Sequence, residues 1–513
     1  MGETNSKPQK FFGSAKNTAN TPNTPNQGLK IKIKLMVKFE NADSSTYSFK
    51  AFDTSDSAEK LLVESEEVAG SNNVASFLTF FIMDYFFEKQ QTIKIVITKG
   101  SEQIVFNTTL GNIVGSRNNT LKKPLGDPHK ETIEISSVEL KGDSNQELRV
   151  MFELGNKQDF DLKKNKYRFY YEVATTSKLY QSENLHLDGT FYSCSIPSPL
   201  LGKEFTISFY HLKKKNMVHS MKCSPEDFVN NANNKTIKFQ FTKHHEVQLI
   251  NKSEIKPAPS FIDYLHSGME INLTIAIDFT GSNGNPQNVG SLHSLVLGRP
   301  NFYEEAISAC GNILCEYDSD QMFPVYGFGA MVNGWTTSMC FNLNMEDDPE
   351  IHTISKILEV YRKNVPSLRF SGPTNFAPII KKVTETIEKE NNKFKYNILM
   401  ILTDGAISDM GDTIKYLVKG STMPLSVIII GIGSGGFGNM EVLDADDKPL
   451  VSGGVTAARD LVQFVPFNRF KEDPKKLAEE VLKEVPDQIM EYYDMNNILP
   501  ETITQMIRSK NNK

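Results

Sequence analysis

Three oxygen-bearing side chains alternate directly after one apolar run. Asp278, Thr280 and Ser282 lie in the segment 278–283, which follows residues 271–277. The run predicts a buried strand, and open α/β sheets bind ligands at the carboxyl ends of such strands. One carboxylate and two hydroxyls are hard donors, which suit Mg²⁺ better than a soft metal. The segment therefore predicts a metal-dependent binding site, and by itself it does not predict catalysis.

Two further oxygen donors occur where the same sheet would supply them. Thr374 lies in a loop that leads into a predicted helix, and Asp404 follows the apolar strand 397–402. We expect Asp278, Ser282 and Thr374 to hold Mg²⁺ or Mn²⁺ directly or through water. Asp404 and Thr280 would hold waters or orient the ligands.

An open coordination position at this metal would accept a carboxylate from a partner, because Mg²⁺ rarely takes a cage made only of protein ligands. The alternative is that strand-end Asp and Thr residues act only as caps and turn formers. Three motifs in this order on one α/β pattern favour the metal site.

Length and composition narrow the class of protein. The 513 residues are too many for one ordinary domain, and 39% hydrophobic with 23% charged residues is typical of a folded soluble chain. A net charge of −6 argues against nucleic acid as a partner. The five cysteines form no Cys-x-x-Cys pair, so neither a disulfide framework nor a zinc site is predicted. With no membrane-spanning run and no signal-peptide core, we expect a cytoplasmic protein.

Hydrophobic patterning divides the chain into five parts. Residues 1–28 predict a disordered tail. Residues 29–126 read as strands, beginning with the strict alternation of 29–35, and residues 127–250 repeat that pattern, with strands expected at 131–139, 147–153, 167–173, 205–210 and 236–241. Both parts predict antiparallel β-sandwiches.

From residue 251 to 498 strand and helix signals alternate, which predicts a doubly wound α/β domain followed by a C-terminal tail, 499–513. Buried parallel strands are expected at 397–403 and 425–432. Helices are expected at 303–314, 351–361 and, as one long element, 475–493.

Several segments together carry a family resemblance: 261–264, 276–286, 317–320, 328–330, 372–378, 402–405 and 463–467. With them, residues 261 to about 495 resemble the A domain of copines, relatives of von Willebrand factor A domains. Upstream, 110–116 and 121–125 resemble the end of a copine's first C2 domain. The resemblance implies two C2 domains, binding of anionic phospholipid membranes and recruitment of intracellular partner proteins. It also implies peripheral recruitment to the plasma membrane or endomembranes.

One departure from the copine pattern concerns Ca²⁺. C2 domains that bind membranes through Ca²⁺ need clustered aspartates, because the ion takes 6–8 oxygen ligands. Here segments 97–101 and 210–215 stand where acidic loops would follow the strands. Asp43, Asp159 and Asp161 are the remaining Ca²⁺ candidates. They are too few for a tight site, so Ca²⁺ is a doubtful cofactor although the family implies it.

Lysines offer a substitute for the missing acids. Lys213, Lys214 and Lys215 share one loop of the second sandwich, where each could attract anionic headgroups by about 1 kcal/mol. They could equally be solvated charges. For the lysines at 30, 32 and 34 the solvated interpretation, protecting a sheet edge, is the favoured one.

These features predict a phospholipid-binding adaptor and not an enzyme. One alternative is a metal-dependent hydrolase in which Asp278 and Asp404 hold a catalytic metal, although no recognised motif supplies a general base. The other alternative is a soluble scaffold that has lost lipid binding.

Overall fold

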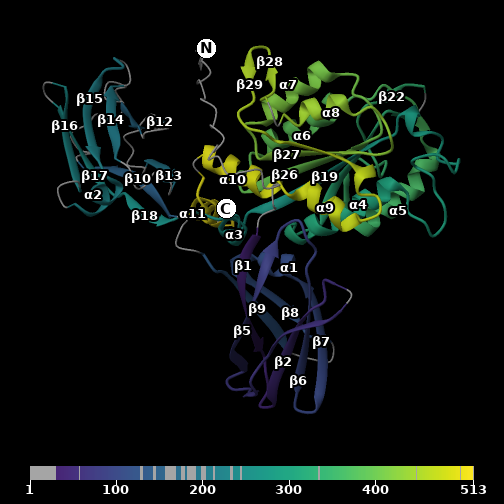
Figure 1. The fold of residues 1–513 in the computed structure, drawn as a ribbon, viewed down its shortest axis with the longest axis horizontal. Helices are drawn as coiled ribbons and strands as arrows, with labels where there is room; N and C mark the ends of the chain where they lie inside the picture. The colour runs from purple at the N-terminus through teal and green to yellow at the C-terminus, as the bar shows by residue number, and fades with distance from the viewer. Residues whose placement is uncertain are drawn as a thin grey trace. The chain divides into compact units, whose positions relative to one another are not determined.

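The chain forms two compact units, Met1–Leu140 together with Phe261–Lys513, and Lys141–Ser260. The computed structural model describes residues 30–56, 58–126, 131–141, 146–155, 169–174, 179–181, 192–197, 204–211, 214–231, 235–242, 245–332, 335–445, 448–496 and 498–511. The predicted tail 1–28 lies outside these residues. Within them, two antiparallel β-sandwiches precede an α/β domain, which confirms the predicted fold class (Figure 1).

The first sandwich pairs a sheet of order β5-β1-β9-β8 with a sheet of order β3-β2-β6-β7, on which β4 also pairs with β2. Its elements are β1 (Lys30–Glu40), β2 (Thr46–Asp53), β3 (Lys60–Glu64), β4 (Val68–Ala69), β5 (Val74–Phe86), β6 (Thr92–Lys99), β7 (Glu102–Thr109), α1 (Leu110–Val114), β8 (Thr120–Pro124) and β9 (Thr132–Glu139). Strand β1 alternates as its sequence predicts: Ile31, Ile33 and Leu35 are buried, and the intervening lysines face outward.

The boundary of the first sandwich lies one strand later than the sequence pattern places it. Strand β9 pairs along its whole length with β1 and also with β8, so it completes the first sandwich and not the second. The predicted boundary at residue 126 is therefore wrong. A strand's own residues do not reveal which sheet accepts its hydrogen bonds, because that choice depends on long-range pairing.

The second sandwich consists of sheets β13-β10-β17-β16, with β18 also on β10, and β12-β11-β14-β15. Its elements are β10 (Gln146–Leu154), β11 (Phe169–Ala174), β12 (Leu179–Gln181), β13 (Tyr192–Pro197), β14 (Phe205–His211), β15 (Met217–Cys223), α2 (Pro225–Asn230), β16 (Thr236–Thr242), β17 (His245–Asn251) and β18 (Glu254–Pro257). Because β18 pairs with β10, this unit continues to Ser260, and the predicted start of the α/β domain at 251 is wrong by ten residues.

The α/β domain is built on a sheet of order β23-β20-β19-β26-β27-β30, in which the strands from β20 to β30 run parallel. The strands are β19 (Glu270–Asp278), β20 (Met322–Phe328), β21 (Ala330–Met331), β22 (Thr337–Ser338), β23 (Phe341–Asn342), β24 (Glu350–His352), β25 (Arg369–Phe370), β26 (Lys395–Thr403), β27 (Leu425–Gly431), β28 (Val451–Ser452), β29 (Val455–Thr456) and β30 (Val462–Pro466). The helices are α3 (Phe261–His266), α4 (Phe302–Leu314), α5 (Ile354–Asn364), α6 (Ala377–Glu390), α7 (Met410–Gly420), α8 (Gly438–Leu443), α9 (Pro474–Leu482), α10 (Val485–Met495) and α11 (Pro500–Asn511).

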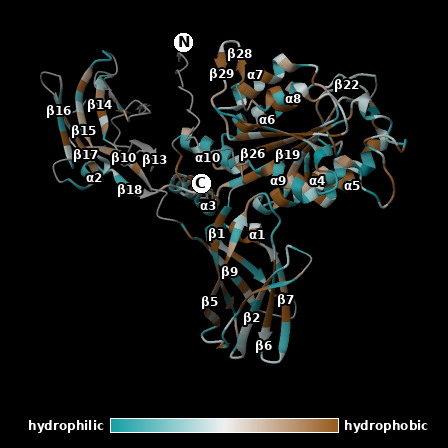
Figure 2. Ribbon diagram, in the orientation of Figure 1, coloured by the Kyte–Doolittle hydropathy of each residue, from teal (hydrophilic) through white to brown (hydrophobic). Residues whose placement is uncertain are grey.

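Helices cover both faces of this sheet, as a doubly wound fold requires (Figure 1). Alternate strand residues point to opposite faces. Ile275 and Ile277 therefore join one core with α4, α5, α9 and α10, and Ala276 joins the other with α6, α7 and α8. The central strands are largely apolar on both faces, which gives them their mostly brown colour in Figure 2.

Two expectations for the C-terminal part are wrong. The single helix predicted at 475–493 is divided into α9 and α10, and Pro486 lies in the first turn of α10, where its missing N–H has no helical partner to lose. The predicted tail contains helix α11, whose Ile503 is fully buried and whose Thr504 hydroxyl donates to the carbonyl of Ser267 at 3.3 Å.

Aromatic side chains join the first sandwich to the α/β domain within one unit. Tyr85 and Tyr317 share a buried hydrogen bond of 2.7 Å between their hydroxyls. The ring of Phe87 packs edge-on against Phe261 at 5.2 Å between centroids. The sequence predicts separate domains here, and it does not predict this packing.

Candidate metal centre

Two aspartates meet at one edge of the parallel sheet. Asp278 is the last residue of β19, and Asp404 directly follows Thr403, the last residue of β26. The two strands are parallel neighbours, with Ile277 opposite Leu402. Their carboxyl ends therefore deliver both carboxylates to the same place, as the sequence predicts.

The Asp278 carboxylate is held from two sides. Its Oδ1 accepts a hydrogen bond from the backbone N–H of Thr280 at 2.8 Å, and its Oδ2 accepts one from the Thr403 hydroxyl at 2.6 Å. The side chain is completely buried. Each oxygen keeps one lone pair for a further ligand, so Asp278 can still contact a cation directly or through water.

Ser282 connects the first motif to Asp404. The Ser282 hydroxyl donates to Asp404 Oδ1 at 2.8 Å and lies 3.0 Å from the hydroxyl of Thr280. Ser282 is exposed, whereas Thr280 is buried. A ligand that approaches from solvent therefore meets the serine first.

Thr374 faces the same space across Gly405. A Cβ atom at position 405 would lie 3.8 Å from both the Ser282 and the Thr374 hydroxyls. A glycine at this position leaves that volume open between the two donors. The Thr374 loop is fixed to the Asp404 loop, because the backbone N–H of Ser408 donates to the Thr374 carbonyl at 2.8 Å.

Asp409 fixes the same two loops by a second route. Its carboxylate accepts hydrogen bonds from the backbone N–H groups of Phe376 at 3.0 Å and Ala377 at 2.9 Å, at the start of α6. A carboxylate is favourable at a helix N-terminus, where free N–H groups point outward. The position of Thr374 is therefore tied to the strand that carries Asp404.

The sequence pattern does not single out two buried residues that support the site. Asn283 Nδ2 donates to Asp404 Oδ1 at 3.0 Å, and its Oδ1 accepts from the Tyr303 hydroxyl at 2.6 Å. His293 Nε2 lies 2.8 Å from the backbone oxygen of Asp278, and its Nδ1 lies 2.7 Å from the Tyr361 hydroxyl. Asn283 adjoins the first motif and could have been suspected. No local signal marks His293.

Burial disfavours the ionised form of both carboxylates when no cation is bound. Burial raises the pKa of Asp278 to about 7, although the hydrogen bonds from Thr403 and Thr280 oppose the rise and the nearby charge of Asp404 adds to it. Burial likewise raises the pKa of Asp404. In the described part of the chain neither carboxylate forms an ion pair.

The donor set fits a hard divalent cation. Two carboxylates and three hydroxyls converge, no basic side chain neutralises the acids among the described residues, and Ser282 opens to solvent. Buried carboxylates that serve only a structural role are normally paired with basic side chains. A divalent cation would supply the missing charge, with Asp278, Ser282 and Thr374 as its nearest donors.

Comparison with known proteins gives the family. A family model described as Copine matches residues 291–501, which include Thr374 and Asp404. Copine-B of Dictyostelium discoideum is 33% identical over 491 residues, covering 86% of this chain and 91% of that relative.

The chain belongs to the copine family.

Other similarities to this copine are more restricted. Copine-D of Dictyostelium discoideum is 44% identical over 254 residues, so the match spans about half of each chain, 48% of both. Among solved structures, the manganese-loaded TRAP protein of Plasmodium vivax covers 43% of this copine and 74% of its own chain, with 13% identity and a TM-score of 0.26.

In the first sandwich of this copine a lysine stands beside the Ca²⁺ candidate Asp43. Lys99 Nζ lies 2.9 Å from Asp43 and 2.5 Å from Glu131, and the Tyr47 hydroxyl donates to Asp43 at 2.9 Å. The Lys99 ammonium lowers the pKa of Asp43. Burial opposes ionisation of Glu131, but the same ammonium lowers its pKa below the usual value. A fixed internal cation thus satisfies the two acids.

The candidates in the second sandwich are only partly described. Asp159, Asp161 and Lys213 lie outside the described residues. Lys214 and Lys215 are exposed, and the backbone N–H of Lys215 donates to the carbonyl of His211 at 2.8 Å. Their role as lipid ligands remains a proposal.

The ion pairs of Lys99 are expected to contribute to the stability of the first sandwich. We expect Lys99→Met to lower the free energy of unfolding by about 1–3 kcal/mol, because the buried Glu131 carboxylate would lose its counter-charge and keep only the Tyr47 hydroxyl, at 3.2 Å, as a partner. The Lys94→Met variant, whose lysine pairs with exposed Glu59 at 2.8 Å, is the control and should cost less than about 1 kcal/mol. Thermal unfolding of the full chain measures both. Equal effects would show that Lys99 is an ordinary surface lysine.

Proposed function

We propose that this copine is an adaptor that associates with anionic phospholipid membranes and recruits partner proteins through a divalent cation in its α/β domain. The observation that carries the proposal is the convergence of Asp278, Ser282, Thr374 and Asp404 without a counter-cation among the described residues. A bound Mg²⁺ or Mn²⁺ would offer an open position to a partner's carboxylate.

The chain's own residues prepare this contact in three ways. Thr280 and Thr403 orient the buried Asp278 carboxylate. Asn283 and Ser282 hold Asp404. The exposed position of Ser282 leaves the approach from solvent open, so an acidic side chain of a partner can reach the cation.

The rival function, a metal-dependent hydrolase, lacks a free base at this site among the described residues. His293 contacts the site, and both of its ring nitrogens are already engaged, with the Asp278 carbonyl and the Tyr361 hydroxyl. Burial lowers its pKa to about 3, so it stays neutral. A phosphatase and nucleotidase screen of the purified chain tests the rival directly.

Ca²⁺ has a smaller role in this proposal than the family implies. In the first sandwich the Lys99 ammonium already pairs with both Asp43 and Glu131. We therefore propose that membrane association depends weakly on Ca²⁺ and that the protein is recruited peripherally. Among the described residues, no helix combines the length and the apolar character needed to cross a bilayer.

A pull-down tests partner recruitment. We expect wild type in Mn²⁺ to retain acidic partners from a cell extract that are lost in EDTA and lost with Asp278→Ala. Asp412→Ala, which removes an exposed carboxylate of α7, should retain them. Partners that stay bound unchanged to Asp278→Ala would argue against a metal-bridged contact.

A further inference from the structure

One outer face of the first sandwich leaves large apolar side chains in solvent. On β5 the exposed fractions are 92% for Leu78, 45% for Phe80 and 48% for Ile82, and on β9 the value for Val138 is 42%. Large exposed apolar patches rimmed by polar groups commonly mark interaction sites. We call this surface, together with Lys30, Lys32 and Lys34, the β5–β1 face.

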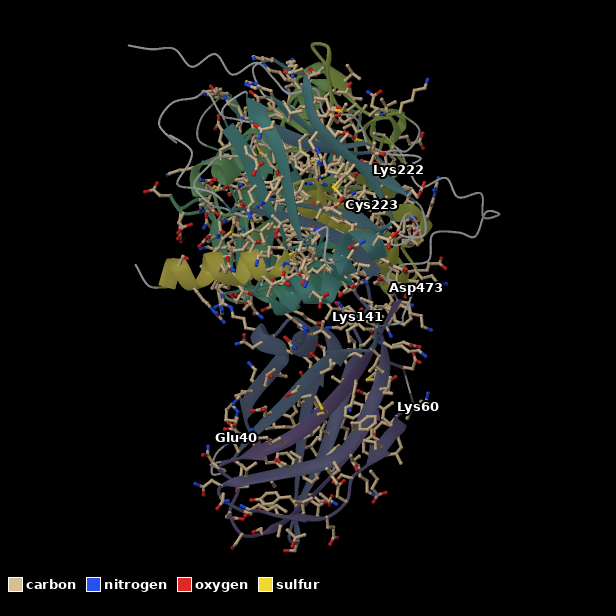
Figure 3. All side chains as sticks on the ribbon, turned by 90° about the vertical axis from the view of Figure 1, so that its left-hand side faces the viewer. Glu40, Lys60, Lys141, Lys222, Cys223 and Asp473 are labelled. Atoms are coloured by element: carbon tan, nitrogen blue, oxygen red, sulfur yellow. The ribbon has the colours of Figure 1, made fainter. Side chains whose placement is uncertain are left out.

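The strand register interleaves lysines with these apolar residues. Lys34 on β1 lies directly between Ile82 on β5 and Val138 on β9. Cross-strand partners share one face of a sheet, so these three side chains form a continuous row. Figure 3 turns the left-hand side of Figure 1 toward the viewer, and its labelled Glu40 marks the end of β1.

The β5–β1 face carries excess positive charge. Lys30 pairs with Asp84 at 2.9 Å, whereas Lys34 lies over the ring of Phe80, 3.9 Å from its centroid. Lys32 is exposed, and neither it nor Lys34 forms an ion pair among the described residues. Lys32 and Lys34 thus add two unpaired positive charges beside the apolar row, and the Glu66 carboxylate that contacts Leu78 and Thr79 offsets one of them.

The outer face of the opposite sheet lacks this combination and serves as a comparison. Leu61 and Val105 are exposed to 51% and 54%, much like the residues of β5. Lys94 beside them, however, pairs with Glu59 at 2.8 Å. Apolar exposure alone therefore does not distinguish the two faces. Lys50 of β2 and Lys94 of β6 pair with Glu64 and Glu59, whereas Lys32 and Lys34 form no ion pair among the described residues.

Strand addition at the edge of β5 is disfavoured. The Glu66 carboxylate accepts hydrogen bonds from the backbone N–H of Leu78 and from the Thr79 hydroxyl. A covered edge amide cannot pair with an incoming strand, which is a common way of protecting edge strands. The face, and not the edge, is what remains available to a partner.

We propose that the β5–β1 face lies against anionic phospholipid bilayers, independently of Ca²⁺. Leu78, Phe80 and Ile82 enter the headgroup region, and Lys32 and Lys34 meet the lipid phosphates. Buried apolar area and attraction of basic residues to anionic lipid together set the strength of such interfacial binding. This inference rests on the proposed membrane association and names the surface that carries it.

Sedimentation of the full chain with vesicles tests the inference. The vesicles are phosphatidylcholine alone, or with about one third phosphatidylserine, in EDTA. Leu78→Glu/Ile82→Glu is expected to weaken binding to the anionic vesicles by roughly tenfold or more, and Lys32→Gln/Lys34→Gln by a similar factor. Leu61→Glu/Val105→Glu, the matched control on the opposite face, should bind like wild type. Thermal unfolding checks that each variant folds.

The possible outcomes separate this inference from the proposed function. If wild type binds anionic vesicles and the two glutamate variants lose binding equally, or neither loses it, the β5–β1 face is not the surface that binds the membrane. Membrane association itself would still hold. A wild type that binds no anionic vesicles, with or without Ca²⁺, would overturn both. A wild-type dimer that Leu78→Glu/Ile82→Glu disperses without affecting vesicle binding would assign the face to a second copy and overturn the inference.

Discussion

The Asp278→Asn variant is expected to bind Mn²⁺ at least roughly 100-fold more weakly than wild type, because it loses the most buried charged ligand of the candidate site. Its fold should survive. An amide oxygen can still accept from the Thr280 N–H, and the Thr403 hydroxyl can turn to accept from the amide nitrogen. Isothermal titration calorimetry of the full chain gives the affinity.

Asp412→Asn is the matched control for this measurement. It removes the same charge from an exposed position in α7 and should leave the Mn²⁺ affinity unchanged. Thermal unfolding in EDTA, compared between Asp278→Asn and wild type, checks that the variant is folded. If Asp278→Asn bound Mn²⁺ as tightly as wild type does, Asp278 would not be a ligand and the metal would bind elsewhere in the chain.

Metal affinity should fall steeply below pH 7. In the metal-free protein burial raises the pKa of Asp278 to about 7, so a cation must displace a proton at lower pH. We expect the Mn²⁺ affinity to be constant above pH 7, about tenfold weaker at pH 6 and roughly 100-fold weaker at pH 5. Calorimetric titrations in two buffers of different ionisation enthalpy report the released proton.

The raised pKa of Asp278 has the opposite effect on the stability of the metal-free protein, which falls as the pH rises. The folded-state pKa of Asp278 lies above the ordinary value, so its contribution to stability is present at low pH and lost as pH rises through about 7. In EDTA, wild type should therefore unfold at a higher temperature at pH 6 than at pH 8, and Asp278→Asn should reduce that difference. A Mn²⁺ affinity that stays flat between pH 8 and pH 5 would contradict the buried, protonatable site.

Local sequence signals are sufficient to predict where the metal-binding carboxylates at the strand ends lie. Asp278 and Asp404 follow apolar runs whose parallel pairing is the default in an α/β pattern, so their meeting at one edge could be predicted. The supporting residues could not. His293 reaches Asp278 from a loop fifteen residues away, and its role depends on how that loop folds back beneath the strand.

The sandwiches show a different limit of sequence reasoning. The strands at 30–40 and 132–139 are each evident from alternation, but only their pairing assigns β9 to the first sandwich. The pairing of Lys99 with Glu131 joins β6 to the residue just before β9, so it follows from the same long-range choice. Asp43 is evident as an isolated acid, whereas its neutralisation by Lys99 is not.

For the lysines of β1, alternation predicts the direction of the side chains, but their surroundings depend on the strand register. Alternation in β1 correctly places residues 30, 32 and 34 on one outward face. By themselves they favour a solvated, protective role. Only the register with β5 and β9 sets Ile82 and Val138 on either side of Lys34, and this apolar context changes the interpretation of the face.

The proposed cation site of the α/β domain is tested most directly by anomalous X-ray scattering from crystals of the full chain grown with Mn²⁺ and Ca²⁺ together. We predict a Mn²⁺ peak bonded to the hydroxyls of Ser282 and Thr374 beside Asp278, and no cation between Asp43 and Glu131, where Lys99 already lies. An empty α/β site, or a cation that displaces Lys99 from its two carboxylates, would contradict this prediction.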